Sequence, residues 1–67
     1  MGFIREEFGM LPGYTLAAAG ELVRQRGGTI RVTKRDGMPL IYEQDYNTSR
    51  VNVATDNGII TAVLGIG

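Results

Sequence analysis

Residues 15–34, TLAAAGELVRQRGGTIRVTK, contain the change from a helical to a strand pattern that decides the fold. In the first part of this stretch, apolar side chains recur at the spacing of one helix face: Leu16, Ala19, Leu22 and Val23. Thr15 precedes them as an N-cap, because its hydroxyl can accept a hydrogen bond from a free amide of the first turn. The sequence therefore predicts a helix over residues 15–26.

The end of this helix is also visible in the sequence. Arginines occupy its last turn, where they suit the negative end of the helix dipole. Gly27-Gly28 then stops the helix, and one of these glycines suits the left-handed C′ position. Gly20 lies in the helix interior, where glycine costs about 1 kcal/mol relative to alanine. We expect close packing of the helix on a sheet to explain Gly20.

A strand and a long connection follow the helix. Residues 29–34 alternate, with Ile30 and Val32 on one face, as in a half-buried strand. Asp36-Gly37 is a turn signal, and Pro39 blocks simple continuation of the strand. Residues 37–49 show no clear buried period, which predicts a long loop, and long ordered loops in small domains tend to be functional.

Alternation resumes at Arg50 and continues to a hairpin. Val51 and Val53 share one face, whereas Arg50 and Asn52 lie on the other. Asp56-Asn57-Gly58 is the strongest hairpin turn in the chain, since Asn-Gly readily takes the positive φ that tight turns require. The sequence predicts that residues 59–64 form the returning strand.

These elements predict one α+β domain over residues 1–67, with a single helix packed on a small mixed sheet. A strand followed by a long crossover permits a parallel central pair, with the long exposed loop between its two strands. The final hairpin then adds an antiparallel strand. Residues 1–12 show no convincing period, and we expect an extended arm or a first edge strand there.

Composition excludes several kinds of chemistry. The chain has no cysteine and no histidine, which removes disulfides, most soft-metal sites, thiol nucleophiles and imidazole acid–base catalysis. Glu43 and Asp45 are the only closely spaced acids in the predicted loop, and nothing nearby supplies further metal ligands in a recognisable pattern. We therefore expect no enzymatic activity, no cofactor and no metal.

The charge pattern argues against two classes of partner. Five basic residues form a cluster in the middle of the chain: Arg24, Arg26, Arg31, Lys34 and Arg35. Seven acidic and seven basic residues balance over the chain, so this cluster, even with Tyr42 and Tyr46 nearby, does not predict nucleic-acid binding. No segment approaches the ~20 apolar residues needed to span a bilayer, and the N-terminal residues are too charged for a signal peptide. We expect a cytoplasmic protein, or a secreted one if a leader was removed, as a monomer or weak homo-oligomer.

One segment carries a family resemblance. Residues 45–60, DYNTSRVNVATDNGII, resemble the strand after the reactive loop of potato inhibitor I proteins, and most closely their bacterial and fungal peptidase-inhibitor relatives. Those relatives read acid-Tyr, three residues, Arg, an aliphatic, Asn or Arg, an aliphatic, then Asp and a turn. The matching positions here are Asp45-Tyr46, Arg50, Val51, Asn52 and Asp56.

The resemblance implies a serine protease inhibitor, of subtilisin- or chymotrypsin-like enzymes, that acts through a substrate-like reactive loop at about residues 36–49. Its contact residues would be Leu40, Ile41, Tyr42, Glu43, Gln44, Asp45 and Tyr46. By register the residue that enters the specificity pocket, P1, is Gln44, with the scissile bond before Asp45. Tyr42, followed by Glu43, is the alternative. Arg50 and Asn52 match the family positions that support the loop from the strand beneath.

The chain also departs from the family pattern near this loop. Glu43 stands where the relatives usually carry threonine, and the segment between Gly37 and Asp45 is longer than theirs. These differences leave open an alternative function, in which the same fold is a non-inhibitory module for protein interaction or assembly.

Overall fold

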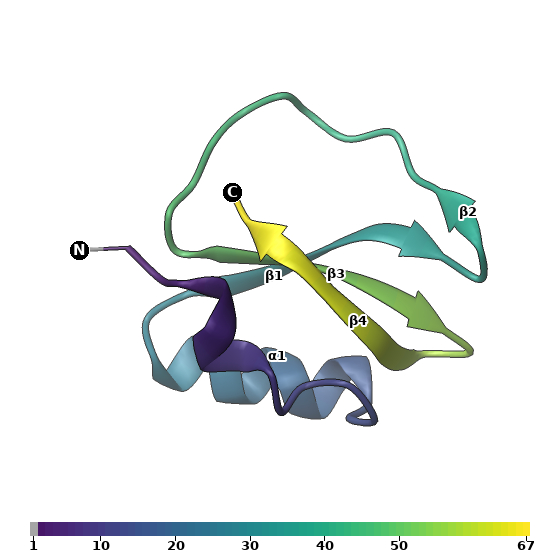
Figure 1. Ribbon diagram of the computed structural model, residues 1–67, viewed down its shortest axis with the longest axis horizontal. Helices are drawn as coiled ribbons and strands as arrows, with labels where there is room; N and C mark the ends of the chain where they lie inside the picture. The colour runs from purple at the N-terminus through teal and green to yellow at the C-terminus, as the bar shows by residue number, and fades with distance from the viewer. Residues whose placement is uncertain (1) are drawn as a thin grey trace.

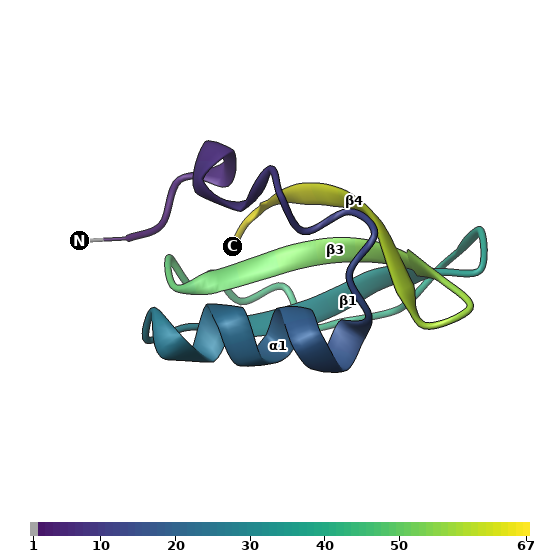
Figure 2. The same ribbon diagram turned by 90° about the horizontal axis from the view of Figure 1, so that it is seen from below.

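The computed structural model describes residues 2–67, in which one helix packs against a four-stranded sheet (Figures 1 and 2). Met1 lies outside the described residues. The elements in chain order are the 3-10 helix η1 (Arg5–Phe8), the helix α1 (Leu16–Gln25) and the strands β1 (Thr29–Arg35), β2 (Met38–Pro39), β3 (Arg50–Asp56) and β4 (Ile59–Ile66). The predicted α+β class is confirmed.

The strands lie in the order β2-β1-β3-β4. β1 and β3 form the central pair and run parallel, while β2 pairs with β1 and β4 with β3 in antiparallel fashion. The sheet is therefore mixed, with the long connection between its two parallel strands as predicted. In the register of β1 and β3, Thr29 is opposite Arg50 and Arg31 is opposite Asn52, which brings their polar side chains to one end of the sheet.

Both ends of α1 use the capping residues that the sequence indicated. The Thr15 hydroxyl accepts a hydrogen bond from the Ala18 N–H at 3.1 Å. At the other end, Gly27 has φ +84°, and its N–H donates to the Arg24 carbonyl while the Gly28 N–H donates to the Val23 carbonyl. These two bonds form a Schellman motif, which stops the helix before β1.

The core lies between the sheet, α1 and the N-terminal segment. Its buried side chains come from all three: Phe8, Leu11, Ala19, Val23, Val51, Val53, Ile60 and Val63. Phe8 and Leu11 are the largest of the fully buried side chains. One amphipathic helix supplies little apolar surface, so the N-terminal segment completes the core of this small domain.

The predicted extended arm over residues 1–12 is therefore wrong. Residues 5–8 form η1, and the chain after it pairs with β4, because the Gly13 N–H donates to the Ile60 carbonyl and the Ile60 N–H donates to the Tyr14 carbonyl. A single 3-10 turn that buries one aromatic side chain leaves no repeating pattern in the sequence, which is why periodicity did not reveal it.

Two tight turns meet at the end of the sheet opposite the polar side chains. Asp36 and Gly37 connect β1 to β2, and Asn57 and Gly58 connect β3 to β4; all four residues have positive φ, as in type I′ turns. The Asp36 carboxylate accepts a hydrogen bond from the Asn57 main-chain N–H at 2.8 Å. This contact ties the two hairpins together.

The hairpin at Asp36 shortens the predicted loop. Met38 and Pro39 pair with β1, and the Leu40 N–H donates to the Thr33 carbonyl at 2.9 Å, so residues 36–39 form a tight turn and a short edge strand. Pro39 is tolerated because β2 is an edge strand, where an absent N–H costs no ladder hydrogen bond. Of the predicted loop over residues 36–49, the part that leaves the sheet therefore begins after Pro39.

The structure also corrects the reason given for Gly20. A Cβ built at this position meets no atom within 4 Å, so close packing does not require glycine there. At Gly28, by contrast, a Cβ would collide with the Phe3 ring and the Ser49 carbonyl. The end of α1, the N-terminal segment at Phe3 and the chain at Ser49 therefore come close together at Gly28.

We predict that Gly20→Ala stabilises the protein by about 1 kcal/mol, because it removes backbone freedom from the unfolded chain and fills open space. Gly28→Ala is the matched control and should destabilise the fold. Urea unfolding of the three proteins measures both changes. A loss of stability in Gly20→Ala would show that the helix needs glycine there for a reason absent from its contacts.

Candidate functional site

The exposed loop, residues 41–46, rises beyond the edge of β1 and returns to the sheet at β3 (Figure 1). All of its residues are exposed, Ile41 completely and Tyr46 to 75%. Within residues 2–67, no main-chain N–H of the exposed loop donates a hydrogen bond to a main-chain carbonyl. The amides of this stretch therefore take no part in the sheet.

Both ends of the exposed loop are fixed to the body. At its start, the Leu40 N–H bonds to Thr33 in β1. After its end, the Asn47 side chain accepts from the Ser49 N–H at 2.8 Å, and the Thr48 carbonyl accepts from the Phe3 N–H at 2.8 Å. The loop is thus an anchored arch.

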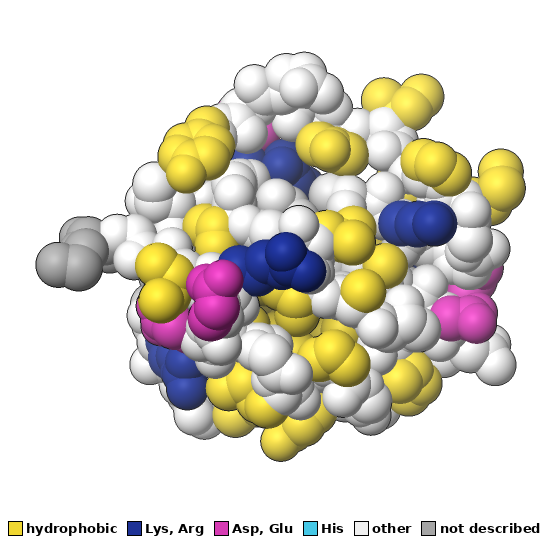
Figure 3. Space-filling model, viewed as in Figure 1, with side chains coloured by type: hydrophobic (Ala, Val, Ile, Leu, Met, Phe, Trp, Pro, Cys, Tyr) yellow, Lys and Arg dark blue, Asp and Glu magenta, His cyan; other side chains and the backbone are white. Residues whose placement is uncertain are grey.

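Two arginines fill the space beneath this arch. Arg31 comes from β1 and Arg50 from the start of β3, and their side chains are only 17% and 15% exposed. Figure 3 shows dark blue basic atoms partly covered beneath the loop, with hydrophobic side chains on either side of them. The positive charges lie behind the loop.

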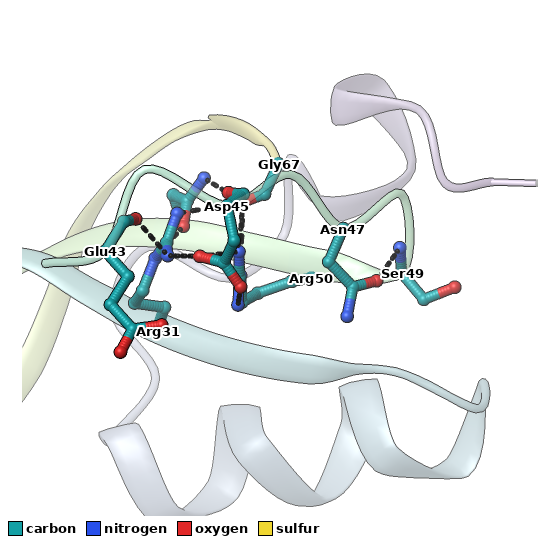
Figure 4. A network of polar contacts seen from close by, with 8 residues as sticks. Arg31, Glu43, Asp45, Asn47, Ser49, Arg50 and Gly67 are labelled. Atoms are coloured by element: carbon teal, nitrogen blue, oxygen red, sulfur yellow. Dashed lines mark hydrogen bonds and ion pairs between the residues drawn. The ribbon is translucent and has the colours of Figure 1, made fainter.

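The arginines hold the loop at one side chain and two carbonyl groups (Figure 4). The Asp45 carboxylate accepts from the Arg31 Nη1 at 3.1 Å and from the Arg50 Nη1 and Nη2 at 3.2 and 3.1 Å. The Glu43 carbonyl accepts from the Arg31 Nη1 at 3.3 Å, and the Asp45 carbonyl accepts from the Arg50 Nη2 at 3.1 Å. Charge-assisted hydrogen bonds of this kind are stronger than neutral ones.

These contacts change the acidity of Asp45. The hydrogen bonds from Arg50 and the attraction of its positive charge, helped by Arg31, hold the pKa of the Asp45 carboxyl below its ordinary value of 3.8. The carboxylate therefore stays ionised, and paired, to lower pH than a free aspartate would.

The main-chain oxygen of Gly67 orients both arginines from the opposite side. It accepts hydrogen bonds from the Arg31 Nη2 at 2.9 Å, the Arg50 Nε at 3.1 Å and the Asn52 Nδ2 at 3.2 Å. The Gly67 N–H in turn donates to the Arg50 carbonyl at 3.0 Å. The guanidinium groups are thereby fixed between the end of β4 and the loop.

The two predicted supporting residues act differently. Arg50 contacts the loop directly, as the resemblance implied. Asn52 has no hydrogen bond to residues 41–46; its side chain accepts from the Arg31 Nε at 2.9 Å and donates to Gly67. Asn52 thus positions Arg31 instead of the loop itself.

Arg31 is the contact residue that sequence reasoning missed. The sequence placed it only in the central basic cluster, although its alternation put it on the same face as Thr29 and Thr33, away from the core. Arg31 could be placed beneath the loop only from the parallel register of β1 and β3, which sets Arg31 beside Asn52. The Tyr42 ring also lies over Arg31, with its centroid 4.4 Å from the Arg31 Cζ.

The remaining predicted loop residues have distinct environments. Leu40 is half-buried where the loop leaves the sheet. Tyr42 is 43% exposed, because one face of its ring covers Arg31. The side chains of Glu43 and Gln44 are exposed and have no hydrogen bond within residues 2–67. The bond from Gln44 to Asp45 therefore lies between two tethered carbonyl groups, those of Glu43 and Asp45.

Residues 2–67 contain no group of three or more His, Cys, Asp or Glu side chains placed to hold a metal ion. Across the same residues, neither helix has the length and apolar character needed to cross a membrane.

The chain was compared with models of known protein families, with curated proteins and with solved structures, and none of the three comparisons gives a match.

We predict that the exposed loop loses order when Asp45 is neutralised. The pKa of this carboxyl is lower in the folded protein, so its contribution is complete well above pH 3.8 and is lost as pH falls through the folded-state value. Amide relaxation measured by NMR from about pH 7 to about pH 2 should show falling order parameters in residues 41–46 before the core unfolds.

The variant Asp45→Ala should show the same mobile loop already at neutral pH. Glu6→Ala, which removes an exposed acid distant in sequence from the loop, is the matched control and should leave the loop ordered. An equally ordered loop in Asp45→Ala would mean that the arginines hold the loop through its carbonyl groups alone.

Proposed function

We propose that this protein is a reversible, substrate-like inhibitor of serine proteases, and that the exposed loop is the part that enters the protease cleft. The proposal rests on the hydrogen bonding of the loop's main chain. Its N–H groups donate to no main-chain carbonyl within residues 2–67, while the carbonyl groups of Glu43 and Asp45, on either side of the Gln44–Asp45 bond, are held by Arg31 and Arg50.

Free amides in an extended segment suit binding by strand addition, in which main-chain hydrogen bonds supply affinity and alternate side chains supply specificity. A flexible peptide loses about 0.5–1.5 kcal/mol of binding free energy for each side chain that it must order on binding. The contacts from Arg31 and Arg50 order the loop beforehand. Affinity is therefore gained without a disulfide.

The same contacts explain how such a loop would resist turnover. If the protease cut the bond between Gln44 and Asp45, the new amino terminus at Asp45 would stay held by Arg50 and Arg31. The Glu43 carbonyl on the other side would stay held by Arg31. With both ends in place, the reverse reaction is intramolecular and strongly favoured by proximity.

The geometry favours Gln44 over Tyr42 as P1. The Gln44 side chain is exposed and makes no hydrogen bond within residues 2–67, so it can enter a pocket without breaking a contact. The Tyr42 ring lies over the Arg31 guanidinium, and its entry into a pocket would remove that contact and uncover the arginine. Such cation–π contacts are worth about 0.5–2 kcal/mol.

We predict inhibition of at least one enzyme in a panel of subtilisin- and chymotrypsin-like proteases at micromolar concentration or below. Long incubation followed by mass spectrometry should locate slow cleavage between Gln44 and Asp45. Absence of inhibition across the panel would favour the alternative of a non-inhibitory interaction module. Cleavage after Tyr42 would favour the other register.

We predict that Arg50→Ala and Arg31→Ala weaken inhibition by roughly 10- to 100-fold, the effect of losing charged hydrogen bonds worth about 1.5–3 kcal/mol. The loosened loop should also be cleaved faster. Arg24→Ala is the matched control, since this arginine lies exposed on α1 and pairs only with Glu21. Inhibition that is unchanged in both variants, with the fold intact by circular dichroism, would contradict the supporting role.

A further inference from the structure

Glu43 is the acidic residue of the exposed loop whose carboxylate makes no polar contact within residues 2–67. Its exposed carboxylate forms no ion pair or hydrogen bond within residues 2–67, although its main-chain carbonyl is held by Arg31 at 3.3 Å. Asp45, two residues on, has its carboxylate paired with both arginines. Figure 4 shows the difference: dashed lines meet the Asp45 carboxylate, whereas the Glu43 carboxylate has none.

The held carbonyl fixes the point of the main chain from which the Glu43 side chain projects. Because Arg31 holds the Glu43 main chain and Arg50 holds that of Asp45, the carboxylate of Glu43 is presented from a constrained segment of backbone. With Gln44 as P1, Glu43 becomes the preceding residue, P2, which lies within the protease cleft during binding. The charge would then be transferred from water to the contact surface.

Such a transfer has an electrostatic consequence for the partner. A carboxylate that enters an apolar subsite loses its hydration and gains no partner, which is strongly unfavourable. A carboxylate that meets a lysine or arginine recovers this cost, and close charge pairs at interfaces are also a source of specificity. Asp45 cannot serve in this way, since its charge is already compensated internally.

We infer that the target is a serine protease whose S2 subsite, which receives the P2 side chain, presents a lysine or arginine. This inference rests on the proposed function and on Gln44 as P1. The exposed loop would then select an enzyme with a basic S2 subsite over one whose S2 subsite is an apolar pocket.

The test uses a subtilisin-like protease that the protein inhibits and a variant of that protease with a lysine introduced at the S2 subsite. Inhibition constants are measured for the native inhibitor, Glu43→Gln and Glu43→Lys against both enzymes. The native inhibitor should bind the lysine-bearing protease about 10-fold more tightly than the parent enzyme. Glu43→Gln should remove this preference, and Glu43→Lys should reverse it.

The preference should also shrink as salt is raised, because screening weakens the new charge pair. Glu6→Gln, which neutralises an exposed acid of η1 outside the loop, is the matched control and should keep the native preference. Equal inhibition of both enzymes by the native protein, or a preference that survives Glu43→Gln, would overturn the inference while leaving inhibition established.

Two further results would separate an error in the S2 assignment from a failure of the proposed function. Cleavage mapped after Tyr42 would make Glu43 the residue that follows the scissile bond, and the S2 assignment would be wrong. If none of the three inhibitors acted on any protease in the wider panel, the proposed function would fail, and the inference would fail with it.

Discussion

The arrangement of this small domain depends on two guanidinium groups placed side by side between a loop and the end of a strand. Arg31 and Arg50 stand on neighbouring parallel strands, and both donate to the main-chain oxygen of Gly67 on one side and to Asp45 on the other. Without them, the exposed loop would have only its ends attached. The planar fork of arginine suits this role, since one side chain can serve several acceptors at fixed angles.

The parallel pairing of β1 and β3 makes this arrangement possible. A parallel pair needs a crossover, and here the crossover runs through β2 and the exposed loop instead of a second helix. The loop must therefore pass over the end of the sheet at which Arg31 and Arg50 lie. The hydrogen bond between Asp36 and Asn57 fixes the hairpins at the opposite end.

The polar side chains of the exposed loop differ in whether they contact the body of the domain. Asp45 is used by the fold, because its carboxylate is paired and its pKa is lowered by Arg50 and Arg31. Glu43 contributes only its main-chain carbonyl, Gln44 makes no hydrogen bond within residues 2–67, and both side chains are exposed to solvent. Substitution of the Glu43 and Gln44 side chains would therefore leave the contacts that support the loop unchanged.

The core shows how little apolar surface a single helix supplies. Ala19 and Val23 are the buried side chains of α1, and Phe8 and Leu11 from the irregular N-terminal segment add the largest buried side chains. Nothing in the local sequence pattern distinguishes these two residues from an exposed arm. Their burial follows from the packing of β4, to which the segment is also hydrogen-bonded.

The sequence by itself determined the elements whose signals are local. Thr15 caps α1, Gly27 ends it, Asn57-Gly58 turns the final hairpin, and alternation places Val51 and Val53 on the buried face; each depends on residues within a few positions of one another. Only the tertiary structure decided that Arg31 joins Arg50 beneath the loop, that Asn52 supports Arg31, and that Gly67 orients both arginines. These contacts join residues distant in the sequence, and their existence depends on strand register, which no local pattern specifies.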